Sequence, residues 1–440
     1  MIRIKNFIVL VGDIVFLYGA LFLTLIIRYG LASFKEPLVN HLKPFSLIFI
    51  IWIITLYLAD LYKDKNLRIS PAVIQLFVLV IGISMTASAI LFYLFPEFFK
   101  LTPKTNLAIF GLMFLILDFI WRFIVIKISI SSGWRNRLLI IGDSPAIVEI
   151  ISFLKTNPQM GYDVVRQIKD YSEQKTEQNI NQIIAEDKIN TILIQARLKE
   201  DPKFTKIFYQ LLLSKIAVVD LISFYEMVFQ KLPLNELEEN WFIEKITTQR
   251  HLYDIAKRVI DIFLSLISII ISLPISLIIA VLTKFSSRQG PVIYRQKRIG
   301  TNNKPFILFK FGVMKADQGS PWTLENDERL TRLGKILNYT HLNEIPQLYN
   351  ILKGDISFTG PRPESEELVE LYKKLPYYEI RHIIKPGFTG WAQLNYKPSA
   401  SLEEAKEKLQ YDIYYIKNRS LVLDLMILLK TVRHVFISNK

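Results

Sequence analysis

The chain has 440 residues, of which 51% are apolar and only 21% charged, and its mean hydropathy is positive at +0.28. This balance excludes a disordered chain and is unusual for a soluble enzyme, so it indicates a membrane protein of about three domains. Lys and Arg outnumber Asp and Glu by 54 to 40, and most of the excess follows residue 250. The absence of Cys excludes disulfides, thiolate metal sites, iron–sulfur clusters and cysteine nucleophiles.

Residues 1–130 are predicted to form a membrane bundle of four helices, because four apolar segments come close to the ~20 residues that a span requires. These segments are 7–27, 45–61, 72–95 and 107–126. The first is too long for a signal peptide and lacks a small-residue cleavage site. In the fourth, Asp118 and Arg122 lie one helical turn apart, so we expect a structural ion pair rather than a transport site.

Residues 131–246 are predicted to form a Rossmann-like α/β domain, because apolar strand patterns at 138–141, 191–195 and 216–221 alternate with helical patterns at 146–155 and 203–213. Gly142 to Pro145 follow the first strand, where a dinucleotide site would carry three glycines. Only one glycine is present, and Asp143 would repel a phosphate. A structural or regulatory domain is therefore predicted in preference to a cofactor-binding one.

Residues 259–283 form a fifth apolar segment, interrupted by Pro274, within a predicted third domain at 247–440. A proline removes a backbone donor and bends a helix, so we expect a re-entrant membrane hairpin whose two ends lie on the same face. A kinked spanning helix is the alternative. The basic residues on both flanks are predicted to be membrane-surface anchors rather than nucleic-acid contacts. They are Lys257, Arg258, Lys284 and Arg288.

Six motifs follow in order after this segment. They are residues 290–300 (GPVIYRQKRIG), 309–311 (FKF), 326–334 (NDERLTRLG), 343–348 (NEIPQL), 354–363 (GDISFTGPRP) and 385–391 (KPGFTGW). Together they resemble the bacterial sugar transferase family, the monotopic polyprenyl-phosphate phosphoglycosyl transferases. The helical bundle and the degenerate nucleotide-binding domain are similar to those of the long-form members, so the resemblance covers essentially the whole chain.

The resemblance implies an α-rich C-terminal catalytic domain that transfers a sugar 1-phosphate from a UDP-sugar to polyprenyl (undecaprenyl) phosphate and releases UMP. This reaction would initiate surface polysaccharide synthesis. It implies a multi-pass protein of the bacterial inner membrane with its catalytic domain on the cytoplasmic face, which agrees with the basic residues after the fourth helix. It also implies an Asp–Glu dyad with Mg²⁺ and a phosphate-binding arginine, which matches Arg362. Lys310 and Arg298 are expected to assist in binding the substrate.

The chain departs from the family pattern at the dyad, where it has Asn343 and Glu344. A carboxamide is uncharged, a poor nucleophile and a weak Mg²⁺ ligand, so Glu344 is left as the expected metal ligand and the covalent step should be slow. The chain is then an impaired relative or an engineered form, or else Glu344 or Asp355 supplies the nucleophile. A second departure is Gly312, which stands where the family usually has Arg.

Two other functions compete with catalysis. One is a non-catalytic membrane scaffold that binds nucleotide sugar or lipid phosphate, and the other is a small-molecule transporter, which would leave the long polar part of the chain without a role. The five His residues lack metal-ligand spacing. Asp327 and Arg329 could form either a surface ion pair or part of a substrate or metal site. For Tyr411, Tyr414 and Tyr415, both simple packing and an aromatic belt at the membrane interface are consistent with the sequence. No nucleic-acid partner is expected, and a homo-oligomer is left open.

Overall fold

The computed structural model describes most of the chain, as two compact units that we treat separately: Met1–Leu221 and Ile222–Lys440. The described residues are 2–59, 61–62, 71–99, 104–131, 136–169, 176–195, 198, 209, 216–247, 250–286, 291–312, 331–397 and 401–437. The predicted helix at 203–213, the motif residues 326–330 and Arg288 lie largely or wholly outside these ranges.

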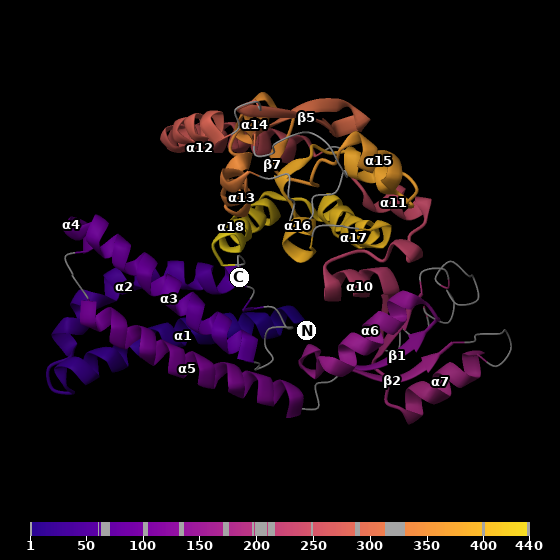
Figure 1. The fold of residues 1–440 in the computed structure, drawn as a ribbon. Coiled ribbons are helices and arrows are strands. Elements are labelled where there is room, and N and C mark those ends of the chain that lie inside the picture. The colour runs from indigo at the N-terminus through magenta and orange to yellow at the C-terminus, as the bar shows by residue number, and fades with distance from the viewer. Residues whose placement is uncertain are drawn as a thin grey trace. The chain divides into compact units, whose positions relative to one another are not determined.

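Long apolar helices form the predicted membrane region of the first unit (Figure 1). Within the described residues they are α1 (Ile2–Tyr29), α2 (Lys35–Leu58), α3 (Pro71–Leu94) and α5 (Lys104–Ser131), with the short α4 (Pro96–Phe99) before α5. Each long helix is apolar enough to cross a bilayer, which confirms the four predicted helices. Their outward side chains are largely apolar, for example Phe7 and Val15, as expected for helices that face lipid.

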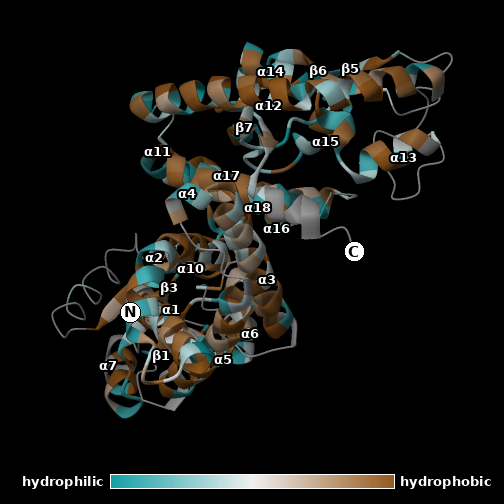
Figure 2. Ribbon diagram, turned by 90° about the vertical axis from the view of Figure 1, so that its left-hand side faces the viewer, coloured by the Kyte–Doolittle hydropathy of each residue, from teal (hydrophilic) through white to brown (hydrophobic). Residues whose placement is uncertain are grey.

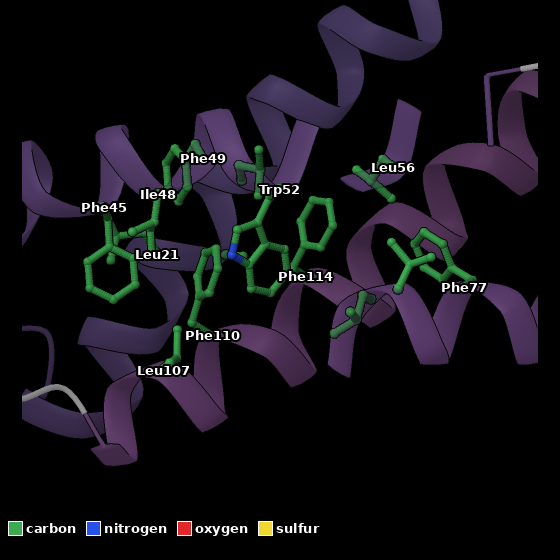
Figure 3. Packing of buried hydrophobic residues seen from close by; sticks show 14 of the residues in the cluster. Leu21, Phe45, Ile48, Phe49, Trp52, Leu56, Phe77, Leu107, Phe110 and Phe114 are labelled. Carbon is green, nitrogen blue, oxygen red and sulfur yellow. The ribbon is translucent and has the colours of Figure 1, made fainter. Parts of the chain in front are cut away.

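Aromatic rings fill the centre of this bundle (Figure 3). The Trp52 ring meets Phe110 and Phe114 edge-on, with centroids 4.9 and 5.4 Å away. Its indole Nε1 donates to the Ser88 hydroxyl at 3.0 Å, so the polar atom of this large ring is satisfied inside the apolar core.

A buried group of three charges links α1 to α5. Arg122 donates from Nε to Asp118 Oδ2 at 2.7 Å, which confirms the predicted pair. It also donates from Nη2 to Asp13 Oδ2 and from Nη1 to the Leu61 carbonyl, both at 2.8 Å. The guanidinium is thus bonded in three directions, and both carboxylates are fully buried. Asp13 was not predicted, because it lies 109 residues from Arg122.

The second part of this unit is a parallel sheet with the order β2-β1-β3-β4 among the described residues. Its strands are β1 (Asn136–Ile141), β2 (Tyr162–Ile168), β3 (Thr191–Ile194) and β4 (Ala217–Asp220). Its helices are α6 (Pro145–Thr156), η2 (Pro158–Met160) and α7 (Thr176–Glu186). The sequence predicted β1, β3, β4 and α6 but missed β2 and α7.

The turn after β1 serves to start a helix. Ser144 caps α6 by accepting from the Ile147 amide at 3.4 Å, and Pro145 occupies the first turn, where its missing N–H costs nothing. Gly142 has φ 134°, and a Cβ there would lie 2.9 Å from the Gln195 side chain. These residues therefore have a local folding role.

The second unit is rich in helices and contains two small sheets among its described residues. Its helices are α10 (Leu221–Phe229), η3 (Leu234–Glu236), α11 (Glu239–Lys245), α12 (His251–Ser286), η4 (Thr301–Asn303), α13 (Arg332–Tyr339), η5 (Leu342–Glu344), α14 (Gln347–Lys353), α15 (Glu366–Tyr372), η6 (Tyr378–His382), α16 (Trp391–Asn395), α17 (Leu402–Asn418) and α18 (Leu421–Ile437). Its strands are β5 (Ile293–Ile299), β6 (Pro305–Phe311), β7 (Ser357–Thr359) and β8 (Gly387–Thr389).

Helix α12 is a single helix of 36 residues with Pro274 inside it, and Figure 2 shows it as a long, mainly hydrophobic ribbon. The predicted interruption at Pro274 is not observed. A proline removes one ladder hydrogen bond, while the neighbouring turns keep theirs, and Ser272 Oγ donates to the Ile269 carbonyl at 3.3 Å. Of its most apolar window only 11% is buried within the protein, so α12 is a fifth helix suited to a membrane.

The basic residues in the first turns of this helix are bonded within the second unit and are not free membrane anchors, which corrects the prediction for Lys257 and Arg258. Arg258 donates to the carbonyls of Ile351 and Leu352 at 2.7 and 2.6 Å, and thereby caps the C-terminal end of α14. Lys257 forms an ion pair with Asp424 of α18 at 2.8 Å. Both cations hold α12 to the rest of the unit. Lys284, near the other end, is exposed.

Candidate active site

An antiparallel hairpin brings two of the predicted cations to one face. In β5 and β6, Tyr294 pairs with Lys310 and Arg298 with Phe306. Directly opposed residues of an antiparallel pair point to the same side, and residues two apart share that side. Arg298 and Lys310 therefore lie on one face of the hairpin although twelve residues separate them.

The predicted dyad lies in a short helical turn between α13 and α14. His341, at φ 57°, redirects the chain into η5, and its carbonyl accepts from the Glu344 amide at 3.0 Å. Asn350 of α14 then acts as an extra partner for β6. Its Oδ1 accepts from the Phe309 amide at 3.0 Å, and its Nδ2 donates to the Ile307 carbonyl at 2.7 Å. This clamp fixes Glu344 beside Lys310.

Two motifs far apart in sequence form the loop that carries Arg362. Strands β7 and β8 are parallel, and beyond them Gly360 donates to the Thr389 carbonyl and Gly387 to the Pro361 carbonyl, both at 2.9 Å. A Cβ on Gly360 would lie 2.6 Å from the Lys385 carbonyl oxygen, so this crossing requires glycine. The prolines on either side of Arg362 stiffen the loop that presents it.

These elements bring Glu344 between two cations. Its Oε1 accepts from Arg362 Nη2 at 2.7 Å and from Lys310 Nζ at 3.2 Å. Burial alone would raise the pKa of the Glu344 carboxyl, but the attraction of Arg362 and Lys310 outweighs burial and lowers it well below its ordinary value. Burial lowers the pKa of Lys310, whereas Glu344 raises that of Arg362. Glu344 is therefore ionised, and the group keeps an excess of positive charge.

Arg298 stands beside this group but bonds elsewhere. It donates to the Pro363 carbonyl at 3.2 Å and to Gln296 Oε1 at 2.8 Å, and it lies 3.9 Å from the Glu364 carboxylate. Burial lowers its pKa. The structure thus brings Lys310 and Arg362 onto Glu344, while Arg298 supports the loop that carries Arg362.

Asn343 is buried, with 4% of its surface exposed, next to Glu344 in the chain. Its Nδ2 donates to Asn338 Oδ1 at 3.3 Å, while its Oδ1 has no hydrogen-bond partner among the described residues. Leaving a buried polar atom unpaired is costly, so this oxygen still lacks the hydrogen-bond or ligand partner that it would normally have. Asp355 lies in the turn after α14, where its Oδ2 accepts from Asn350 and Lys353, both at 3.1 Å.

Steric crowding explains why glycine occupies position 312, where the resemblance would place an arginine. A Cβ there would lie 2.1 Å from the Pro291 carbonyl oxygen, so no side chain fits without moving the backbone. Asp327 and Arg329 lie outside the described residues.

The tyrosines of α17 pack within the unit. Tyr415 is buried and its hydroxyl donates to Asp424 at 2.7 Å, while the Tyr414 ring stacks on Trp391 with the ring centroids 5.8 Å apart.

Sequence reasoning missed a buried charge cluster behind the Arg362 loop. Glu364 accepts from Lys408 at 2.6 Å, and Arg381 donates both to Asp412 Oδ2 and to the Arg362 carbonyl at 2.9 Å. In the sequence, the signal that could have pointed to Glu364 was its position directly after the 354–363 motif. No group of three or more His, Cys, Asp or Glu side chains is arranged to hold a metal ion within the described residues.

The chain is similar to known proteins over this unit and beyond. The family model for bacterial sugar transferases matches residues 252–438. The UDP-N-acetylgalactosamine-undecaprenyl-phosphate N-acetylgalactosaminephosphotransferase of Aeromonas hydrophila is 36% identical over 227 residues, 51% of this chain and 53% of that protein.

Longer matches extend into the first unit. The UDP-glucose:undecaprenyl-phosphate glucose-1-phosphate transferase of Klebsiella pneumoniae is 30% identical over 322 residues, 69% of both chains. The protein of the same name from Escherichia coli K12 is 29% identical over 343 residues, 71% of this chain and 72% of that one. The matched part is thus about half of the Aeromonas protein and about seven tenths of the other two. On this extent of similarity, the chain belongs to the bacterial sugar transferase family.

Proposed function

We propose that this protein transfers a sugar 1-phosphate from a UDP-sugar to undecaprenyl phosphate with release of UMP, the first step of a surface polysaccharide. The observation that carries the proposal is the Lys310–Glu344–Arg362 group, in which two cations share one carboxylate. The names of the Aeromonas, Klebsiella and Escherichia relatives describe this reaction class with two different sugars.

The charges of this group suit a diphosphate. Arg362 is 32% exposed at its side chain and presents a planar fork of donors, the geometry that binds phosphate oxygens in pairs. Lys310 adds a point charge from β6. Together they would hold the diphosphate and stabilise the charge that builds up on the departing UMP.

Asn343 occupies the position of the attacking carboxylate in the resemblance. There the Asp oxygen would form a bond to the phosphorus next to the sugar as the bond to UMP breaks, and the lipid phosphate would then displace the Asp. The neutral Asn343 amide lacks the lone-pair reactivity of a carboxylate, so turnover of this sequence should be slow. Binding of the UDP-sugar should survive, since Lys310, Arg362 and Glu344 remain.

A Mg²⁺ ion fits the donors present. Magnesium prefers oxygen ligands and commonly uses one or two protein carboxylates together with substrate phosphates. Glu344 and the unpaired Asn343 Oδ1 are two buried oxygen donors adjacent in the chain. When bound, the ion would neutralise diphosphate charge. A weaker amide ligand at 343 predicts lower Mg²⁺ affinity than a carboxylate would give.

The membrane arrangement is also a proposal. We place the protein in the bacterial inner membrane with its catalytic unit in the cytoplasm and both ends of α12 on that face. Although α12 is continuous, such a return would bend it at Pro274, where a backbone donor is missing, and the bonds of Lys257 and Arg258 attach its first turns to the second unit. Because the chain has no Cys, His251→Cys and Lys284→Cys can each be labelled in sealed inverted vesicles. Labelling of the two positions from opposite sides would show that α12 crosses.

The parallel sheet of the first unit we propose to be a Rossmann-like domain without a nucleotide. Its strand order, β2-β1-β3-β4, occurs in doubly wound folds. The Ser144 cap and the exposed Asp143 carboxylate support a structural role at the turn where such folds bind phosphate.

UMP release tests the main proposal. Purified protein in lipid nanodiscs would receive undecaprenyl phosphate, Mg²⁺ and a panel of UDP-sugars that includes UDP-glucose and UDP-N-acetylgalactosamine, and the Asn343→Asp variant would be tested in parallel. Calorimetry should detect Mg²⁺-dependent binding to both proteins. Binding without UMP release from either would favour the scaffold alternative, and no binding of any UDP-sugar would contradict the proposal.

A further inference from the structure

The loop 360–364, which carries Arg362, is held from behind by arginines that bind its backbone carbonyls. Arg381 donates to the Arg362 carbonyl at 2.9 Å, and Arg298 donates to the Pro363 carbonyl at 3.2 Å. The Glu364 carbonyl accepts from the Ile299 amide at 3.1 Å, which joins the loop to the end of β5. Three successive carbonyls are thus fixed from β5 and η6.

Glu364 is the carboxylate that these cations share. Its side chain is 9% exposed and lies 3.8 Å from Arg381 and 3.9 Å from Arg298, while Lys408 donates to it at 2.6 Å. Burial alone would raise its pKa, but Lys408 and Arg381 lower it to about 2, so Glu364 is ionised at neutral pH. Asp412 holds the other side of the Arg381 guanidinium at 2.9 Å.

We propose that Glu364 is a positioning residue for substrate binding, which orients Arg298 and Arg381 so that they hold the loop with Arg362 turned toward Glu344. It acts through the loop backbone and makes no contact with the substrate itself. A buried arginine that loses its carboxylate partner must seek another, so its bond to a carbonyl weakens or shifts. The position of the Arg362 fork depends on those carbonyls. The proposal rests on the proposed use of Arg362 to bind the diphosphate.

Glu364→Gln is the direct test, because it removes the charge and nearly preserves the shape. Losing well-placed charge-assisted hydrogen bonds should weaken UDP-sugar binding by about 10- to 100-fold. Glu226→Gln is the matched control. Glu226 is a largely buried carboxylate of α10 that accepts from Lys417 of α17 and from Asn418, and it makes none of its bonds to the loop. It should leave the affinity unchanged. Glu364→Asp keeps the charge and should restore most of the binding.

Hydrogen exchange of the full-length protein without substrate gives an independent readout. Pro361 and Pro363 have no amide, so Gly360, Arg362 and Glu364 report on the loop. Their exchange should be faster in Glu364→Gln and unchanged in Glu226→Gln. If Glu364→Gln fails to fold, Lys408→Met removes the nearest partner of Glu364 and should produce the same faster exchange.

The outcomes separate the two proposals. Unchanged affinity in Glu364→Gln, with binding lost in Arg362→Ala, would overturn the positioning role and leave the proposed function standing. If the unsubstituted protein binds no UDP-sugar, the proposed function fails and loop exchange alone decides. Faster exchange in Glu364→Gln would then support the role of Glu364 in holding the loop, and unchanged exchange would overturn it.

Discussion

Two groups of buried charges, one in each unit, are built from similar side chains but differ in balance and in access. In the membrane bundle, Arg122 is shared by Asp13 and Asp118, and its side chain is 9% exposed. In the second unit, Glu344 is shared by Lys310 and Arg362, and Arg362 is 32% exposed. The first group has more carboxylates than cations, and the second has more cations than carboxylates.

The Arg122 group holds helices together, whereas the Glu344 group is suited to binding a ligand. Each of the three guanidinium nitrogens of Arg122 donates a hydrogen bond within the protein, and the side chain is only 9% exposed, so a further anion has little access to it. Arg362 donates to Glu344 through one nitrogen and stays partly open, so it retains donors for an oxyanion. The second group therefore differs from the first in its excess positive charge and in the exposure of Arg362 to solvent.

The largest expected effect comes from placing a carboxylate next to the open group. Asn343→Asp should raise UMP release by several orders of magnitude, because loss of a covalent nucleophile has cost about 10⁶-fold in other enzymes. Asp is nearly isosteric with Asn, so the fold should persist. The variant should also form a covalent phosphosugar adduct at residue 343, detectable by mass spectrometry of the intact protein.

Spontaneous deamidation is the necessary control, since a trace of protein in which Asn343 had deamidated would imitate weak native activity. Peptide mapping should establish the Asn343 content before each assay, at equal Mg²⁺ concentration. Robust turnover by verified Asn343 protein, unchanged in Asn343→Asp, would identify Glu344 or Asp355 as the nucleophile instead.

Replacing the arginine of each group should have different consequences. Arg122→Met leaves two buried carboxylates without their partner and should destabilise the bundle by about 3–5 kcal/mol. Arg362→Met should change stability little, since Glu344 keeps Lys310, but should weaken UDP-sugar binding by about 100-fold. Thermal unfolding in detergent and calorimetry measure the two effects. Loss of stability in both variants, with binding retained, would remove the distinction between the groups.

The sequence predicted features that depend on neighbours in the chain. Four membrane helices follow from local apolar runs, and the Asp118–Arg122 pair follows from helical spacing. Asp13, 109 residues from Arg122, carried no such signal. Strand β2 was missed because Asp163, Arg166 and Gln167 dilute its apolar pattern, and α7 because its apolar content is low.

For the candidate site, the sequence predicted which residues take part but not how they are arranged in space. Family motifs indicated Lys310, Glu344 and Arg362, whereas their contact depends on β5–β6 pairing and on the Asn350 clamp. Lys257 and Arg258 look like lipid anchors in sequence, because they directly precede the apolar segment 259–283. Their partners, Asp424 and the carbonyls of Ile351 and Leu352, lie 93 to 167 residues away.

Acid should reveal the effect of a buried histidine in the second unit. Burial, aided by Arg381, lowers the pKa of His382 from its ordinary 6.5 to about 4. Between these values the unfolded chain binds a proton that the folded chain does not, so stability falls as pH falls from 6.5 to 4. The loss should reach about 3 kcal/mol. Denaturant unfolding of His382→Gln should show a smaller loss in this window.

Stability should also fall in a second pH range, below that of His382, because of Glu364. Its folded pKa of about 2 lies below the ordinary 4.5, so its contribution is present above 4.5 and is lost as pH falls toward 2. Glu364→Gln should flatten only that lower part of the profile. A profile that both substitutions leave unchanged would mean that neither group is buried as described.

Salt should have the smallest effect and should act on the two charge groups differently. Salt screens charges that are open to solvent and scarcely affects buried pairs, so raising salt from 50 to 500 mM at constant Mg²⁺ should weaken UDP-sugar binding by roughly three- to tenfold. The stability that Arg122 gives the bundle should not change over the same range, which the difference in unfolding temperature between the unsubstituted protein and Arg122→Met would measure. Arg362→Met should bind UDP-sugar with a shallower salt dependence, because one of the screened charges is absent. Equal salt dependence with and without Arg362 would mean that its guanidinium does not contact the diphosphate, and the excess positive charge around Glu344 would then need another explanation.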